Sequence, residues 1–153
     1  MKYAVTTRQV GAELIAAVRV RTPIAVIASA WKPALDQVWA FLGAHPELRA
    51  GGHNLFLYHH PARREDPMDI DFGVQVPSRF ASEGNVACVE TPEGEVATTT
   101  HIGPYDQLRG AHEAVHAWCA ANNRAIGAMS WETYGDWGAD PAKLETTVSY
   151  LLR

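Results

Sequence analysis

The sequence predicts an α+β fold built from a duplicated strand–helix–strand–strand unit, and three observations support this prediction. The chain has 153 residues, of which 47% are hydrophobic and 20% are charged, enough for one compact domain with a substantial core. Strand-like alternation surrounds two stretches with helical periodicity, and several short motifs recur in the second half. We therefore expect one domain over residues 1–153, with pseudo-repeats at 1–78 and 85–153.

The first half is predicted to contain one helix with strands before and after it. In residues 16–22, two valines alternate with two arginines, which is typical of a strand with one buried face. A helix is expected after Pro33 and is expected to end before Pro46 or at Gly51-Gly52. Its apolar positions at helical spacing are Leu35, Val38, Trp39, Phe41 and Leu42. The other predicted strands cover residues 3–10, 54–60 and 68–77.

The second half is predicted to follow the same order. Two strands, at 86–90 and 95–102, are separated by Pro92-Glu93-Gly94, which indicates a hairpin turn. A helix starts near Pro104, because proline suits a first helical position. Asn122-Asn123 and Gly127 are expected to end this helix. Its buried face is expected to hold Leu108, Ala111, Val115 and Trp118, with Cys119 at the edge, and strands follow at 129–134 and 144–152.

Short motifs relate the two halves. Asp36-Gln37-Val38 corresponds to Asp106-Gln107-Leu108 at an offset of 70 (106 − 36). Residues 51–58 correspond to 127–134, and 68–77 to 144–153, at an offset of 76 (134 − 58). We expect a longer second helix to absorb the difference of six residues. The two units are expected to form sheets that join or face each other.

The strand at 129–134 carries a carboxylate among aromatic rings. Alternation places Ser130, Glu132 and Tyr134 on one face, and Met129, Trp131 and Thr133 on the other. By the offset of 76, Phe56 corresponds to Glu132 and Tyr58 to Tyr134, so these four side chains are expected to approach one another where the halves meet. This arrangement suggests a ligand surface; the alternative is a solvent-facing glutamate on an ordinary antiparallel strand.

Charge and hydropathy argue against several classes of protein. The net charge is −4 and the pI is about 5.9, and Arg63-Arg64 is followed at once by Glu65-Asp66, so we expect no direct contact with nucleic acid. Arg19, Arg21 and Pro23 interrupt the apolar stretch at 14–27 and argue against a membrane span. Without a secretory signal sequence, a cytoplasmic protein is expected, in which Cys88 and Cys119 are small core residues and not a disulfide.

Three features resemble a known family: the Gly103-Pro104-Tyr105 helix start, the Glu132-x-Tyr134 strand, and the closing strand after Asp140-Pro141. They are similar to GyrI-like small-molecule-binding domains, which also serve as effector-binding modules of AraC-type and MerR-type multidrug regulators. The resemblance covers nearly all of residues 1–153, and 95–152 most closely. It implies two strand–helix–strand–strand (SHS2-type) repeats around a ligand groove.

The resemblance also implies site residues and a function. Glu132 would be the counter-charge for a planar, often cationic aromatic compound, and Tyr134 and Tyr105 would be pocket residues. Further pocket candidates are Trp39, Phe56, Tyr58, Trp131 and Tyr150. No cofactor or metal is implied. The regulators carry a DNA-binding segment for which this chain has no room before its first repeat, so we expect a stand-alone module, with a protein partner or a second copy of the chain left open.

Two other activities occur in similar proteins. One is hydrolysis of cyclopropane-bearing genotoxins, in which Glu132 would orient or deprotonate a water molecule while the neighbouring rings hold the substrate. The other is inhibition of a topoisomerase through a stable protein complex. A binding pocket and this hydrolase would use almost the same residues, so the sequence does not separate them.

Residues 112–116 match the H-E-x-x-H motif of zinc proteases, in which two histidines on one helix face bind the metal. Here His112 lies about 65° and His116 about 105° from the predicted apolar stripe. We therefore place both on the helix flank, and the resemblance places this helix on the outer side of the sheet. His59-His60 point to opposite faces of a strand, so metal binding is not predicted there either. Neither cysteine has a nearby histidine partner that would indicate a nucleophile.

Overall fold

The computed structural model describes residues 3–153; residues 1 and 2, which the predicted domain includes, lie outside the described part. The strands and helices are, in chain order, β1 (Thr6–Val10), β2 (Leu14–Thr22), α1 (Ile27–Ala44), β3 (Asn54–His59), β4 (Met68–Gln75), β5 (Val86–Glu90), β6 (Gly94–Ile102), α2 (Arg109–Ala121), β7 (Ile126–Tyr134) and β8 (Glu145–Leu152). The predicted α+β class is confirmed.

All strands in this part of the chain join one antiparallel sheet in the order β1-β6-β8-β7-β3-β4-β2-β5. The strand order is symmetric. Exchanging β1, β2, β3 and β4 with β5, β6, β7 and β8, respectively, gives the same order read from the other end. The two units therefore join through β3 and β7 at the centre of a single sheet. Each unit also lends its first strand to the other, because β1 pairs with β6 and β5 pairs with β2.

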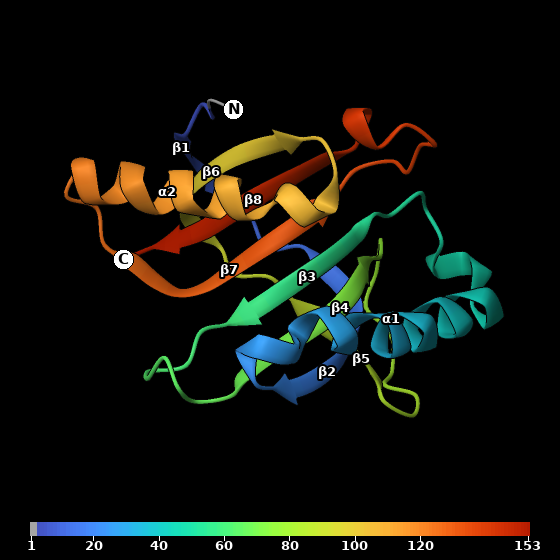
Figure 1. The fold of residues 1–153 in the computed structure, drawn as a ribbon. Helices are drawn as coiled ribbons and strands as arrows, with labels where there is room; N and C mark the ends of the chain where they lie inside the picture. The colour runs from blue at the N-terminus through green and yellow to red at the C-terminus, as the bar shows by residue number, and fades with distance from the viewer. Residues whose placement is uncertain (1–2) are drawn as a thin grey trace.

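Both helices lie on one face of the sheet. Helix α1 packs on β2 and β4, and α2 packs on β6 and β8, so that β3 and β7 run between them (Figure 1). Each helix buries one apolar stripe, and each fully buried aliphatic side chain contributes roughly 1.5–3 kcal/mol. The stripes are Ala34, Leu35, Val38, Phe41 and Leu42 in α1, and Ala111, Val115 and Cys119 in α2. Trp118, predicted as a buried position, is half-buried, and Cys88 is also half-buried.

The sheet is strongly curved, and two short connections show why. Only residues 11–13 link β1 to β2, and only 91–93 link β5 to β6, although each pair is six positions apart in the sheet. Six strand spacings would span about 29 Å in a flat sheet, whereas such a connection reaches about 14 Å at most. The sheet must therefore bend until its ends approach one another.

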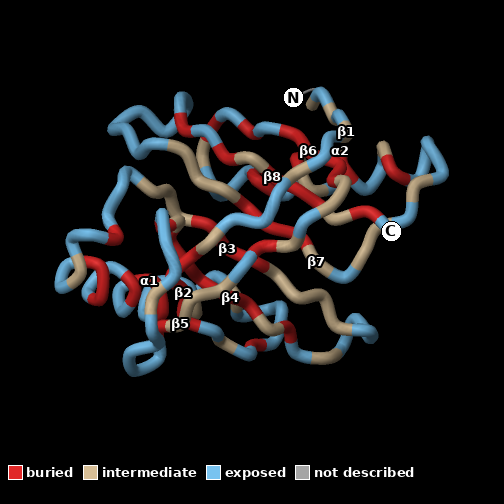
Figure 2. The backbone as a smooth tube through the Cα atoms, turned by 180° about the vertical axis from the view of Figure 1, so that it is seen from behind, coloured by how far each residue is buried: buried red, intermediate tan, exposed pale blue. Residues whose placement is uncertain are grey.

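The bend buries the face that carries no helix. An apolar cluster there contains Ile15, Ala17, Leu55, Leu57, Val96 and Trp131. Seen from behind, buried segments run through the central strands (Figure 2). The 91–93 connection is fixed by Thr91, whose amide donates to the Glu13 carbonyl and whose hydroxyl accepts from the Glu13 amide.

Three predictions about local structure were wrong. Pro92-Glu93-Gly94 does not form a hairpin, because the adjacent strands pair with distant partners and the connection crosses between the two ends of the sheet. Helix α1 starts at Ile27 and keeps Pro33 inside it, at the cost of the one intrahelical hydrogen bond that a residue with an amide hydrogen would make there. The second helix is shorter than the first, with 13 residues against 18.

The ends of α2 depend on backbone conformations that few residues adopt. Gly103 has φ 141°, which lets the chain turn from β6 into Pro104 and the helix. Asn123 ends the helix in the left-handed region at φ 53°, as predicted. Gly127 lies within β7 and does not end the helix as predicted. A Cβ there would lie 3.0 Å from the Leu151 carbonyl oxygen, so the absence of a side chain at Gly127 permits close approach of β7 and β8.

None of the helices within residues 3–153 is both long enough and apolar enough to cross a membrane.

Candidate functional site

A groove of about 1000 Å³ lies between α1 and α2, over β3 and β7. One wall comes from the start of α1, the other from the start of α2, and the floor comes from the central strands. The residues that line it are Ile24, Ala25, Ile27, Ala28, Trp31, Leu35, Asn54, Phe56, Tyr58, Phe72, Tyr105, Leu108, Arg109, His112, Glu132, Tyr134, Gly135 and Trp137.

The register of β3 and β7 assembles the floor of the groove. Phe56 lies directly opposite Glu132 in the ladder, and these two residues are also equivalents at the offset of 76. Tyr58 and Tyr134 are equivalents as well and flank this pair. The predicted approach of all four side chains where the halves meet is therefore what the structure shows.

Glu132 is 6% exposed and is surrounded by hydrogen-bond donors. Its Oε1 accepts from the Tyr58 hydroxyl at 2.5 Å and from the Tyr134 hydroxyl at 2.6 Å. Its Oε2 lies 2.7 Å from His112 Nε2. The other ring nitrogen, His112 Nδ1, lies 2.7 Å from the Tyr150 hydroxyl. A buried carboxylate with three donors satisfies the hydrogen-bonding requirement that burial imposes.

The network keeps Glu132 ionised. Burial alone would raise the pKa of Glu132, but hydrogen bonds and charge from His112, together with hydrogen bonds from the two tyrosines, lower it below its ordinary value. Burial, followed by the negative charge of Glu132, holds the pKa values of Tyr58 and Tyr134 well above the usual range. Both hydroxyls therefore stay protonated and continue to donate. The floor of the groove thus holds an ionised carboxylate with His112 as its hydrogen-bond partner.

Aromatic rings surround this carboxylate. Tyr134 packs edge-on against Phe56 and Tyr105, with ring centroids 4.9 and 5.4 Å apart. Trp31 lies 6.4 Å from Phe56. At the mouth, Trp137 is 78% exposed. The two contacts of Tyr134 have the edge-to-face geometry that aromatic pairs prefer, and the rings together give the groove an apolar lining.

His112 and Trp31 are among the groove residues that the sequence patterns did not identify. His112 had been placed on the helix flank, and Trp31 before the start of a helix. The signal for His112 was the repeat, read at the right offset: groove positions in the two helices correspond at 77 (112 − 35), not 70. With an offset of 77 in the helices and 76 in the strands, the pair His112 and Glu132 replaces the apolar pair Leu35 and Phe56 of the other half.

Three predicted pocket residues lie elsewhere. Trp131 is 4% exposed and lies on the opposite face of the sheet, in the apolar cluster there. Trp39 lines a separate hollow and donates through Nε1 to Asn54 Oδ1 at 3.2 Å. Tyr150 is buried under α2 and reaches Glu132 only through His112. Strand parity excludes Trp131, and helix rotation excludes Trp39.

The two histidines of the H-E-x-x-H motif have different surroundings. His112 binds Glu132, whereas His116 packs edge-on against the Tyr150 ring at 4.8 Å. Among residues 3–153, no group of three or more histidine, cysteine, aspartate or glutamate side chains is arranged to hold a metal ion.

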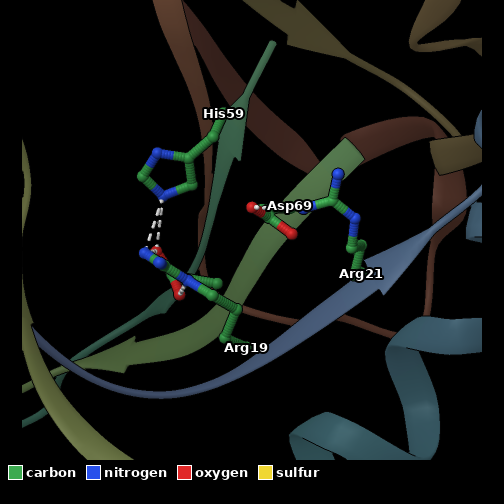
Figure 3. Close-up of polar contacts among 5 residues, drawn as sticks. Arg19, Arg21, His59 and Asp69 are labelled. Atoms are coloured by element: carbon green, nitrogen blue, oxygen red, sulfur yellow. Dashed lines mark hydrogen bonds and ion pairs between the residues drawn. The ribbon is translucent and has the colours of Figure 1, made fainter. Parts of the chain in front are cut away.

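A second polar cluster lies on the opposite face of the sheet, on β2, β3 and β4 (Figure 3). Arg19 donates to both carboxylate oxygens of Asp71, at 2.8 and 2.9 Å, and His59 Nε2 lies 2.7 Å from the same carboxylate. Asp71 is 1% exposed. Burial would raise its pKa, but hydrogen bonds from His59 and Arg19 lower it overall. The cluster lies away from the groove and ties three strands together.

Comparison with solved structures places the fold. The C-terminal domain of EcmrR superposes with a TM-score of 0.81 at 24% identity, covering 100% of this chain and 99% of that domain. In the EcmrR–DNA complex the chain spans 57% of the EcmrR polypeptide. SAV2435 bound to tetraphenylphosphonium gives 0.72 at 13% identity over 100% and 94%. A hydrolase from Listeria innocua gives 0.66 at 14% identity over 97% and 91%. At these identities the likeness concerns the fold.

Comparison of sequences gives the family. A search of curated protein sequences found no match. A sequence profile of the GyrI-like small molecule binding domain matches residues 4–150, which is nearly the whole chain. The chain therefore belongs to the family of GyrI-like small molecule binding domains.

Proposed function

We propose that this chain binds small aromatic cations in the groove between α1 and α2, with Glu132 as the counter-charge. The observation that carries the proposal is a carboxylate, 6% exposed and held by the Tyr58, Tyr134 and His112 side chains, at the floor of an aromatic-lined groove of about 1000 Å³. Arg109, which also lines the groove, is 90% exposed, and its guanidinium is paired with Glu113 at 2.9 Å. Arg109 therefore does not neutralise Glu132, whose charge can attract a cation when His112 is neutral.

The energetics favour a cation over a neutral molecule of the same shape. A cation over an aromatic face gains roughly 0.5–2 kcal/mol per ring, and Trp31, Tyr105 and Tyr134 present rings to the groove. In a partly desolvated site, attraction to Glu132 adds to this gain. The similarity in fold to a protein bound to tetraphenylphosphonium, a bulky aromatic cation, supports the choice of ligand class.

Calorimetric titration with tetraphenylphosphonium tests the proposal. Saturable binding is expected, and Glu132→Gln is expected to weaken it by at least about tenfold, or about 1.4 kcal/mol. Glu65→Gln is the matched control, because Glu65 is an exposed carboxylate in the loop after β3 and its loss changes the net charge equally. Affinity retained in folded Glu132→Gln protein would overturn the proposal.

A pair of tryptophans locates the binding surface. Trp31→Ala is expected to weaken tetraphenylphosphonium binding, because the ring lines the groove. Trp39→Ala, on the same helix but lining another hollow, is expected to leave binding within about twofold. Equal loss in both variants would place the ligand elsewhere.

Hydrolysis of a cyclopropane-bearing compound is the alternative function. A general base works best when its pKa lies near the working pH, whereas the network lowers the pKa of Glu132 and occupies both of its oxygens. These contacts favour binding over catalysis. Mass spectrometry with sub-stoichiometric protein decides between them: water addition beyond one equivalent, lost in Glu132→Gln, would establish the hydrolase.

A further inference from the structure

His112 is built into the ligand groove as a partner of the carboxylate. Its side chain is 24% exposed and lines the groove, while Glu132 lies behind it. The contact between His112 Nε2 and Glu132 Oε2 is 2.7 Å. The corresponding positions in the first half, Leu35 and Phe56, are apolar. The second half therefore carries a charge and, beside it, a group able to cancel that charge.

The surroundings of His112 accommodate two protonation states without rearrangement. In the neutral ring, Nε2–H donates to Glu132 while Nδ1 accepts from the Tyr150 hydroxyl. In the protonated ring, Nδ1–H donates to the Tyr150 oxygen, since a hydroxyl can act in either role. Burial, and then the charge of Glu132, raises the pKa of Tyr150 to about 12, so that Tyr150 remains a hydroxyl in both cases.

We propose that His112 sets the charge selectivity of the groove: neutral His112 leaves a net negative site that takes aromatic cations, and protonated His112 makes a net neutral site that rejects them. This inference rests on the proposed function. Imidazole is the side chain that ordinarily gains a proton between about pH 8 and pH 5. Glu132 stays ionised over that range, so the net charge of the pair changes from −1 to 0. Proton uptake and cation binding then oppose each other reciprocally.

Other titratable groups face His112 and must be separated from it. On α2, Arg109 lies one turn before it and His116 one turn after it. Tyr58 on β3, His60 directly after β3, Glu132 and Tyr134 on β7, and Tyr150 on β8 also lie around it. Of these, the two other histidines are the groups that could titrate in the same pH range. Burial, followed by the charges of neighbouring histidines, lowers the pKa of both.

The test is calorimetric titration of the full chain at about pH 8 and about pH 5.5 with two probes, tetraphenylphosphonium and uncharged triphenylphosphine oxide. We expect the cation to bind at least about tenfold more weakly at the lower pH, and the neutral probe to change by less than about twofold. His112→Gln, whose amide can still donate to Glu132 but cannot titrate, is expected to lose the pH dependence. His116→Gln is the matched control and is expected to keep it.

The outcomes separate this inference from the proposed function. If cation binding needs Glu132 but is equally tight at both pH values, or if His112→Gln keeps the pH dependence, the role of His112 is overturned and the proposed function stands. If Glu132→Gln binds the cation as well as the natural chain, the proposed function fails. Should His112→Gln not fold, proton NMR of the unsubstituted chain still decides: saturating tetraphenylphosphonium must move the His112 titration at least about one pH unit lower, and an unmoved titration refutes the inference.

Discussion

Tyr134→Phe tests whether the hydroxyl groups stabilise the ionised form of Glu132. The substitution removes one charge-assisted hydrogen bond of 2.6 Å to a carboxylate that is 6% exposed and keeps the ring. Hydrogen bonds to charged groups contribute about 1.5–3 kcal/mol, so we expect the free energy of unfolding to fall by that amount at pH 7. Because the lost hydrogen bond favours the ionised form, the pKa of Glu132 should rise in the variant.

The pH dependence of this effect has a definite sign. The folded state lowers the pKa of Glu132, so the stabilisation is present above the unfolded pKa, about 4.3, and is lost as the pH falls through the folded value. The difference between Tyr134→Phe and the natural chain should therefore shrink when the carboxylate is protonated.

Urea unfolding at pH 7 and at a pH below the folded pKa of Glu132 measures the difference. Tyr105→Phe is the matched control, since Tyr105 lines the same groove, is 39% exposed, and makes no side-chain hydrogen bond within residues 3–153. It should cost less than about 0.5 kcal/mol. A loss in Tyr134→Phe that is the same at both pH values would show that the hydroxyl does not act on the ionised carboxylate, and would refute the reasoning.

Two further predictions concern stability, and urea midpoints measure both. Asp71→Asn should lower the free energy of unfolding by about 1–3 kcal/mol at pH 7, because it removes the partner of Arg19. The control, Asp69→Asn, changes a 33%-exposed carboxylate and should cost less than about 0.5 kcal/mol. Equal effects would contradict the role of the buried cluster. Gly127→Ala should lower the free energy of unfolding by about 1–3 kcal/mol, because the added Cβ meets the Leu151 carbonyl. The control, Gly43→Ala, places its Cβ in open space on α1 and should raise the free energy of unfolding by about 0.5–1 kcal/mol. A stable Gly127→Ala would show that β7 and β8 can separate there.

Part of the site followed from the sequence because it depends on short-range periodicity. Strand alternation placed Glu132 and Tyr134 on one face, and the internal offset related them to Phe56 and Tyr58. These rules hold whatever the rest of the fold does, since a strand has a fixed side-chain period of two. The same rule, applied strictly, would have excluded Trp131 from the pocket.

The remaining features depend on long-range packing. His112 lies on the edge of an apolar stripe, and only the position of β7 beside α2 turns that edge into a groove wall. Trp31 was not identified as a groove residue because Pro33 was interpreted as the start of a helix, whereas Pro33 lies inside the longer helix α1. The pairing of β5 with β2 could not be predicted from Pro92-Glu93-Gly94, because strand pairing depends on long-range packing across the whole sheet and not on the local turn residues.

The exchange of first strands between the two halves has a consequence for folding. Neither half can complete its own edge: β2 needs β5, which follows β4, and β6 needs β1 from the start of the chain. A fragment ending near residue 78 would expose an unpaired strand, a template for aggregation. Many native pairings therefore join residues distant in sequence, which predicts slow folding. Unfolding of either half removes a strand that pairs with the other half, so both halves should unfold in one cooperative transition.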